Sequence, residues 1–131
     1  MIYYETGDLY KGNLLSGKRH GPGYYFDRAG QKTYNGNFMN DKRHGQGTLC
    51  TDRDGTDNMY VYDGEWFEGC RNGLGQEVTS KGKYNGEWLE DLRHGQGISV
   101  DKDNNMYEGT FSFGKKHGNG KLIKYTQVAA G

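Results

Sequence analysis

The sequence predicts an all-β protein: an elongated, twisted, single-layer antiparallel sheet of about five stacked β-hairpins. Two observations carry this prediction. A block with constant internal offsets recurs five times along the 131 residues, and such self-similarity is typical of stacked repeats. The 23 glycines would suit a disordered linker, but they occupy fixed offsets, and aromatic residues make up 14% of the chain. Disordered segments lack such large apolar side chains.

Each block opens on Tyr-x-Gly, continues with an aromatic residue or Leu, and closes on Gly-x-Gly. The opening tyrosines are Tyr10, Tyr34, Tyr62, Tyr84 and Tyr107. Four residues after them stand Leu14, Phe38, Trp66, Trp88 and Phe111, and ten residues after them stand His20, His44, Asn72, His94 and His117. The spacing between blocks varies while these offsets do not. The block is therefore the folding unit, and the remainder is connector.

The fourth block shows why each unit is expected to be a hairpin. Tyr84, Gly86 and Trp88 are two residues apart, so in a strand their side chains share one face. Residues 90–93 read as a polar turn, and residues 95–100 as the returning strand. The glycines two and thirteen residues after each tyrosine are expected to leave room for rings of neighbouring hairpins.

The hairpins are expected to divide the chain into three parts. Residues 1–9 form a partial N-terminal repeat or a cap, residues 10–125 form the five repeats, and residues 126–131 form a disordered tail. Cys50 and Cys70 occupy non-equivalent positions of their blocks and belong to no Cys-x-x-Cys pair. Two free thiols are the expected state.

The block resembles the MORN repeat (membrane occupation and recognition nexus). The resemblance is clearest in residues 34–47 and 84–97, where Tyr-x-Gly-x-Phe/Trp precedes a basic turn and His-Gly-x-Gly. Leu14 in the aromatic position and Asn72 in the histidine position are departures from the pattern. The resemblance implies stacked hairpins whose groove or face holds a partner segment or a second copy. It also implies cytoskeletal, ciliary or membrane-proximal assemblies.

Composition restricts the classes of partner. The 17 basic and 17 acidic residues give a net charge of zero, which argues against nucleic acid, because that binding depends on neutralising phosphates. No stretch approaches the roughly 18 apolar residues of a transmembrane segment. The N-terminal residues also lack the pattern of a signal peptide. We therefore expect a cytoplasmic protein without a transmembrane segment.

Motifs for catalysis and for metal binding are incomplete. Gly-x-Gly lacks the third glycine of a dinucleotide fingerprint, and no nucleophile elbow, P-loop or kinase motif occurs. The four histidines lie on four different hairpins, and all four are too far apart to converge on one zinc ion. Residues 101–105 begin like a calcium loop, but Met106 and Ser112 stand where Gly and Glu are required. The acidic segment 52–57 likewise does not match the pattern of a calcium-binding loop. The sequence predicts no enzyme, no cofactor and no metal.

Two features are candidate binding surfaces. The first is an aromatic stripe along one face, which a single layer cannot bury by itself, and exposed aromatic surface marks partner sites. The stripe consists of Tyr34, Phe38, Tyr62, Trp66, Tyr84, Trp88, Tyr107 and Phe111. The second is a basic rail along one edge, consisting of Lys18, Arg19, Lys42, Arg43, Arg71, Arg93, Lys115 and Lys116. Core packing and a solvated edge are the alternative interpretations.

The predicted function is a non-enzymatic scaffold or adaptor. It binds a partner polypeptide through the aromatic stripe or associates with itself as a homodimer. The alternative is a peripheral membrane module that binds acidic phospholipids or phosphoinositides through the basic rail. The resemblance places either module in the cytoplasm, associated with the cytoskeleton or a cilium, or close to a membrane.

Overall fold

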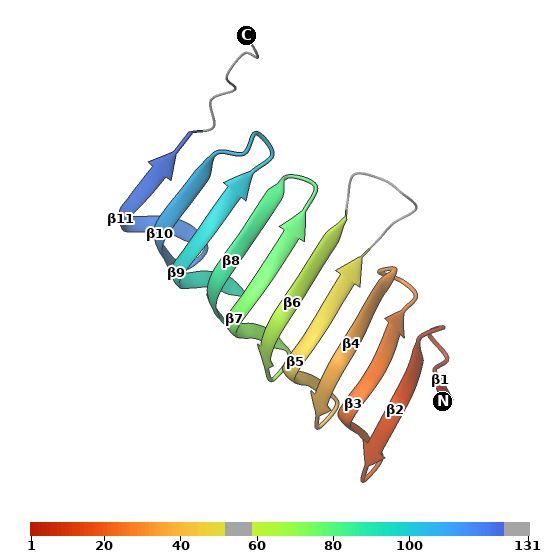
Figure 1. The fold of residues 1–131 in the computed structure, drawn as a ribbon. Helices are drawn as coiled ribbons and strands as arrows, with labels where there is room; N and C mark the ends of the chain where they lie inside the picture. Colours follow the sequence, from red (N-terminus) through yellow and green to blue (C-terminus); the bar gives the residue numbers. More distant parts are fainter. Residues whose placement is uncertain (52–58, 125–131) are drawn as a thin grey trace.

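The computed structural model describes residues 1–51 and 59–124, which form one antiparallel sheet of 11 strands (Figure 1). Each strand pairs with the next one along the chain. The strands are β1 (Ile2–Tyr3), β2 (Leu9–Leu15), β3 (Lys18–Asp27), β4 (Lys32–Met39), β5 (Lys42–Thr51), β6 (Tyr60–Phe67), β7 (Cys70–Thr79), β8 (Gly82–Leu89), β9 (Leu92–Asp101), β10 (Met106–Ser112) and β11 (Lys115–Ile123). The predicted all-β stack of hairpins is confirmed. The described part of the chain contains no helix able to cross a membrane.

The hairpin of β8 and β9 represents the repeating unit. Tyr84 lies opposite Ser99, and Gly86 lies opposite Gly97. Tyr84 and Trp88 are buried, whereas the intervening Asn85 and Glu87 are exposed. The predicted alternation is therefore confirmed, and Tyr10 and the eight members of the aromatic stripe line the same face of the sheet.

The turns that close the hairpins are shorter than the sequence suggested. In the fourth repeat only Glu90 and Asp91 form the turn, with φ angles of 47° and 68°. Positive φ at both central residues is the signature of a type I′ turn, whose twist matches that of the paired strands. Residues 90–93 were predicted as a four-residue turn, which is wrong, because Leu92 and Arg93 already belong to β9.

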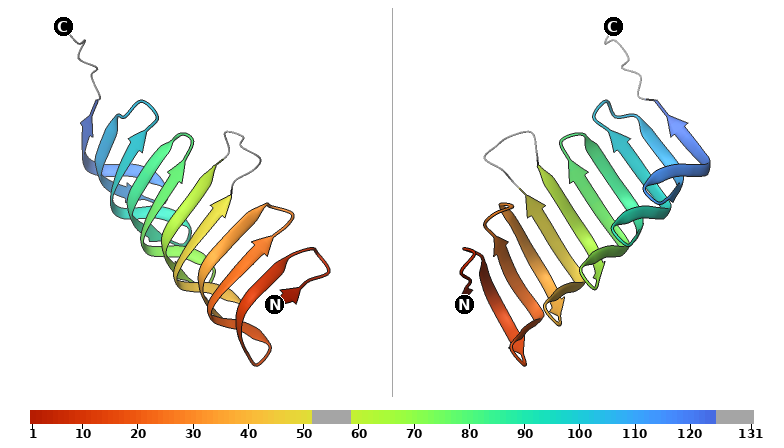
Figure 2. Two further views of the ribbon diagram at one scale, coloured as in Figure 1. Left: turned by 45° about the vertical axis from the view of Figure 1, so that its right-hand side comes forward. Right: turned by 180° about the vertical axis from the view of Figure 1, so that it is seen from behind.

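Each hairpin bends halfway along its length. In the fourth repeat the register shifts between Gly86 and Trp88, because Trp88 pairs with Arg93 while Gly86 pairs with Gly97. Within the bend, Gly95 has a φ of 91°, which favours glycine. Figure 2 shows the turn ends of the hairpins curving out of the plane of the strands. The bend brings each turn towards the aromatic face.

The connectors and the first residues add little to the sheet. β1 pairs with β2, with Ile2 opposite Tyr10, so the predicted partial repeat contributes one short strand. In the loop 101–105, Asp101 Oδ1 accepts hydrogen bonds from the backbone N–H groups of Asp103 (2.9 Å) and Asn105 (3.0 Å). This carboxylate stabilises a turn. The acidic segment 52–57 and the predicted tail 126–131 lie outside the described residues.

Candidate functional site

The aromatic stripe is the core of the protein. Its eight members and Tyr10 are 0–8% exposed. Neighbouring rings meet edge to face, as in Tyr62 with Trp66 (4.9 Å between centroids) and Tyr62 with Trp88 (5.3 Å). Each such pair contributes ~0.5–1.5 kcal/mol beyond its buried area. The rings thus connect each repeat to the next in one continuous row.

The expectation that a single layer leaves these rings exposed is wrong. The physical reason is the bend, which turns the closed end of each hairpin over the ring face and removes it from water. The indole N–H groups of Trp66 and Trp88 also find hydrogen-bond acceptors within the protein. They donate to the carbonyl oxygens of Gly47 (3.0 Å) and Gly75 (3.1 Å), respectively. The burial of the stripe shows that its side chains form the core. Partner binding through the stripe is not tested by this burial and stays a prediction.

The paired glycines accommodate the tyrosine of their own hairpin. A Cβ at Gly97 would lie 2.4 Å from Tyr84 Oη, and one at Gly86 would lie 2.5 Å from the Gly97 Cα. Tyr84 Oη reaches past both glycines and donates to the carbonyl oxygen of Glu87 at 2.8 Å. Rings of neighbouring hairpins were expected in this space, so that detail of the prediction is wrong. Burial raises the pKa of Tyr84 to about 12, because the ring is held away from water.

A row of four arginines covers the rings. This arginine row consists of Arg19, Arg43, Arg71 and Arg93, each with its guanidinium carbon about 4.6 Å from a ring centroid. Arg43, for example, lies over Trp66, and Arg71 lies over Trp88. A desolvated cation over a ring face is attracted by the ring quadrupole. The arginines therefore stabilise the core.

The basic rail is not one continuous exposed edge. Lys18, Lys42, Lys115 and Lys116 are exposed, whereas the arginine row is half-buried. The residues eight and nine positions after each block tyrosine, such as Lys42 and Arg43 after Tyr34, are neighbours in a strand, so their side chains point to opposite faces. The sequence interpretation placed both positions in a turn, where this alternation does not apply. Lipid binding by these eight residues stays a prediction.

Aspartates in two of the turns bind the arginines of the preceding repeat. Asp91 Oδ1 accepts from the backbone N–H of Arg71 (2.8 Å) and from its Nε (3.1 Å). Asp41 does the same for Arg19, at 2.8 Å and 3.1 Å. These hydrogen bonds lower the pKa of the Asp41 carboxyl, led by the one from the Arg19 backbone. Successive repeats are thus joined through charge-assisted hydrogen bonds.

Histidines replace the aspartates at the intervening junctions. His44 Nδ1 accepts from the backbone N–H of Glu68 (3.2 Å), and His94 Nδ1 accepts from that of Phe113 (3.3 Å). These two histidines satisfy turn donors. Among the described residues, no group of three His, Cys, Asp or Glu side chains is placed to hold a metal ion. Cys50 and Cys70 are free thiols.

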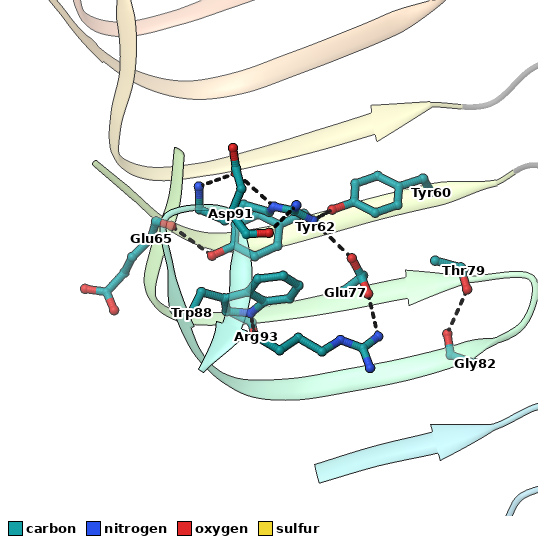
Figure 3. Close-up of polar contacts among 11 residues, drawn as sticks. Tyr60, Tyr62, Glu65, Glu77, Thr79, Gly82, Trp88, Asp91 and Arg93 are labelled. Carbon is teal, nitrogen blue, oxygen red and sulfur yellow. Dashed lines mark hydrogen bonds and ion pairs between the residues drawn. The ribbon is translucent and has the colours of Figure 1, made fainter. Parts of the chain in front are cut away.

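Glu77 joins two members of the arginine row (Figure 3). Its Oε2 lies 3.1 Å from Arg71 Nη1, and its Oε1 lies 2.7 Å from Arg93 Nη2. The Glu77 side chain is only 12% exposed. Arg71 also donates to the hydroxyl of Tyr60. Burial by itself lowers the pKa of Arg71, but Tyr60, Asp91 and Glu77 outweigh that effect, so this pKa is raised.

Two adjoining hollows open beside the arginine row. The first, of about 340 Å³, is lined by Arg19, Tyr25, Asp27, Lys32, Thr33, Tyr34, Phe38, Asp41, Lys42, Arg43, Leu49 and Gly69. The second, of about 410 Å³, is lined by Lys32, Arg43, Leu49, Thr51, Tyr60, Trp66, Arg71 and Asp91. Because they share Lys32, Arg43 and Leu49, we treat the two hollows together as one feature, the arginine groove. Its walls combine apolar side chains with more cations than carboxylates.

Sequence reasoning had placed several groove residues in the aromatic stripe and the basic rail, but it missed Tyr25 and Leu49, which also line the groove, and Glu77, which pairs with two arginines of the row. Tyr25, Leu49 and Glu77 occupy equivalent positions on the returning strands, and Asp41 and Asp91 occupy equivalent turn positions. A position-by-position comparison of the five blocks would have singled out both positions as variable and chemically distinct. Their contacts with the arginine row depend on the bend, which no residue pattern predicted.

Comparison with known families identifies the repeats. The family model described as the MORN repeat matches residues 10–31, 34–55, 62–83, 84–106 and 107–126. No curated protein matches the chain. MORN repeats are generally associated with binding to proteins or membranes.

Proposed function

The chain belongs to the MORN-repeat family, and we propose that it is a non-catalytic scaffold that holds a partner polypeptide in the arginine groove. The observation that supports this proposal is the groove itself, which crosses strands β3 to β7 and mixes ring faces, Leu49 and uncompensated positive charge. Polypeptide interfaces use this combination, with apolar anchors surrounded by polar groups.

A scaffold role also suits the polar groups around the groove. Asp41, Asp91 and Glu77 bind arginines, and His44 accepts a backbone N–H. Each of these side chains maintains the junction between two repeats. The family resemblance alone supports the further proposal that the assembly is cytoplasmic and cytoskeletal, ciliary or membrane-proximal. Self-association through the same groove is one form that the scaffold can take.

Site-specific photo-crosslinking tests the groove. A photoreactive amino acid at Leu49 lies in the groove, whereas one at the exposed Gln76 lies on the opposite face of the sheet, because Gln76 pairs with Asn85 and not with a buried ring. We expect cross-links to a polypeptide, whether a partner or a second copy, from position 49 and not from position 76. Cross-links from position 76 alone would exclude the groove as the binding site.

The second candidate is a peripheral membrane module. It is favoured by one specific arrangement at the hairpin turns, where exposed cations stand beside exposed apolar side chains. Lys18 lies opposite Leu15, and Lys42 lies opposite Met39. Leu15 and Met39 are 58% and 43% exposed. Lysines near an anionic leaflet each contribute on the order of 1 kcal/mol, and the apolar side chains would enter the headgroup region.

A further inference from the structure

The four arginines of the row differ in their counter-charges. Arg19 pairs with Asp41, Arg71 with Asp91 and Glu77, and Arg93 with Glu77. Arg43 takes part in none of the ion pairs formed by residues 1–51 and 59–124. Among the described residues, its side chain makes one hydrogen bond, and that is a long one, 3.5 Å from Nη2 to the carbonyl oxygen of Gly69. Arg43 is thus a half-buried cation over the Trp66 ring with no carboxylate at ion-pair distance in the part of the chain that the structure describes. Asp91 lines the same hollow and attracts Arg43, but its carboxylate bonds to Arg71.

Three residue differences between the repeats cause this gap. Gly69 stands in the turn position that Asp41 and Asp91 occupy in other repeats, so no turn carboxylate reaches Arg43. Leu49 stands six residues after Arg43 in β5, where Glu77 stands six residues after Arg71 in β7. The third source is the returning strand of the preceding repeat, from which Glu77 reaches Arg93, and Tyr25 stands at the equivalent position before Arg43. None of the three positions that supply an anion in other repeats therefore carries a carboxylate beside Arg43.

The missing counter-charge has an electrostatic consequence. Burial lowers the pKa of Arg43, whereas the pKa of the equivalent Arg71 is raised by its partners. A desolvated cation without a partner is unfavourable, and a carboxylate that supplies charge-assisted hydrogen bonds offsets that cost. An incoming carboxylate therefore gains more at Arg43 than at any other member of the row.

The surroundings of Arg43 restrict the chemistry of the ligand. Arg43, Lys32 and Leu49 line both hollows, and Tyr25, Phe38 and Tyr60 complete the apolar walls. A ligand side chain with a charged end group and an aliphatic part fits such walls when the adjacent ligand residues are apolar. The aliphatic part and the apolar residues contact the rings, while the charged group contacts the guanidinium. An acidic side chain within an otherwise apolar peptide segment has this composition.

We propose that Arg43 is a recognition point for an acidic residue of the partner, whose Asp or Glu carboxylate occupies the place that Glu77 fills beside Arg71. This inference rests on the proposed groove-binding function and adds the chemistry of the bound segment. The carboxylate bonds to the guanidinium, and the flanking apolar side chains of the segment lie against Leu49 and Tyr60. Partners with neutral side chains at that position are bound less tightly.

Selection from a random-peptide library displayed on phage tests the proposal. The bait is the full chain as wild type, as Leu49→Glu and as Leu49→Gln. Glutamate at position 49 supplies the carboxylate internally, with the Arg71–Glu77 spacing, and keeps the fold. Glutamine has nearly the same size without the charge. Thermal melting confirms that all three are folded.

The three baits give distinct outcomes. We expect wild type to select peptides with an acidic residue at a constant place, and Leu49→Gln to keep that preference at lower affinity, because an apolar contact is lost. Leu49→Glu should lose the preference itself and bind the selected peptides about tenfold more weakly than Leu49→Gln or worse. A peptide consensus without an acidic residue, or the same acidic consensus on all three baits, overturns the inference and leaves the scaffold function standing. If none of the three baits selects any peptide, the scaffold function is overturned as well. If wild type binds phosphatidylserine vesicles and Leu49→Glu does not, Arg43 is assigned to a lipid headgroup instead.

Discussion

Asp91 binds Arg71 across the junction of the third and fourth repeats, through both the backbone N–H (2.8 Å) and the Nε (3.1 Å) of the arginine. The arginine carbonyl in turn accepts from the backbone N–H of Asp91 at 3.0 Å. Because the guanidinium also covers Trp88, one arginine connects the turn of the next repeat to the aromatic core. The fold is therefore held together by contacts between repeats as well as by the sheet hydrogen bonds.

Replacing the charge of Asp91 tests this junction. Asp91→Asn retains the size and tolerates the positive φ, but it loses the ion pair. We expect a loss of about 1 kcal/mol in the free energy of unfolding, a modest value because the side chain is 47% exposed. Urea titration measures it, with Glu90→Gln in the same turn as the control. Equal stability of the two variants would show that the junction contributes nothing.

Acid should weaken the same junctions. The pKa values of Asp41 and Asp91 are lowered from the ordinary 3.8 by hydrogen bonds from Arg19 and Arg71, which at Asp91 outweigh the opposing effect of burial. A lowered pKa in the folded state adds stability that is complete above pH 3.8 and is lost as the pH falls through the folded value. The double variant Asp41→Asn, Asp91→Asn should show a shallower decline of stability between roughly pH 5 and pH 2, the range in which carboxyl groups titrate. An unchanged slope would contradict the assignment.

The space beside Tyr84 should not tolerate a side chain. Gly97→Val would place a Cβ 2.4 Å from Tyr84 Oη, and we expect a loss of roughly 3 kcal/mol, at the upper end of overpacking costs. Ser99→Val, two residues along the same face of β9, is the matched control and should change stability little. Thermal melting compares them. A Gly97→Val protein as stable as its control would refute the packing of tyrosine on its own hairpin.

Alkaline conditions should unfold the sheet as the core tyrosines ionise. Burial raises the pKa of Tyr34 and of Tyr84 from 10.0 to about 12. The neutral form is favoured in the folded state, so this stability is complete below pH 10 and is lost as the pH rises through about 12. Tyrosinate absorbance and the circular dichroism of the sheet should therefore change together. Ionisation of the buried rings at pH 10 with an intact sheet would contradict their burial.

The membrane alternative is tested on the exposed lysines. Lys18→Glu with Lys42→Glu should leave the melting temperature unchanged, because neither lysine takes part in an ion pair of the described residues. If the turns bind an anionic leaflet, vesicle binding should fall at least tenfold, since about 1 kcal/mol is lost for each cation removed and like-charge repulsion is added. Co-sedimentation with phosphatidylserine vesicles measures it. Equal binding by wild type and variant would remove the lysines from any lipid site.

The sequence by itself determined the repeat count, the hairpin unit and the shared face of the residues in the aromatic stripe. These features are local. Tyr84, Gly86 and Trp88 share a face because side chains alternate along a strand, and the constant offsets between blocks place equivalent residues in register. The same reasoning identified the family through the residues of the repeat.

Only the tertiary structure decided which of those residues are available to a ligand. The bend at Gly95 and its equivalents turns each hairpin over the rings, so the aromatic stripe became core and the arginine row became its cover. The counter-charge of an arginine then depends on the next turn and on its own strand, as in Arg71 with Asp91 and Glu77, or on a strand of the preceding repeat, as in Arg93 with Glu77. Such contacts follow from three-dimensional approach between segments, which strand alternation does not encode. The distinction between Arg43 and the other arginines arises in this way.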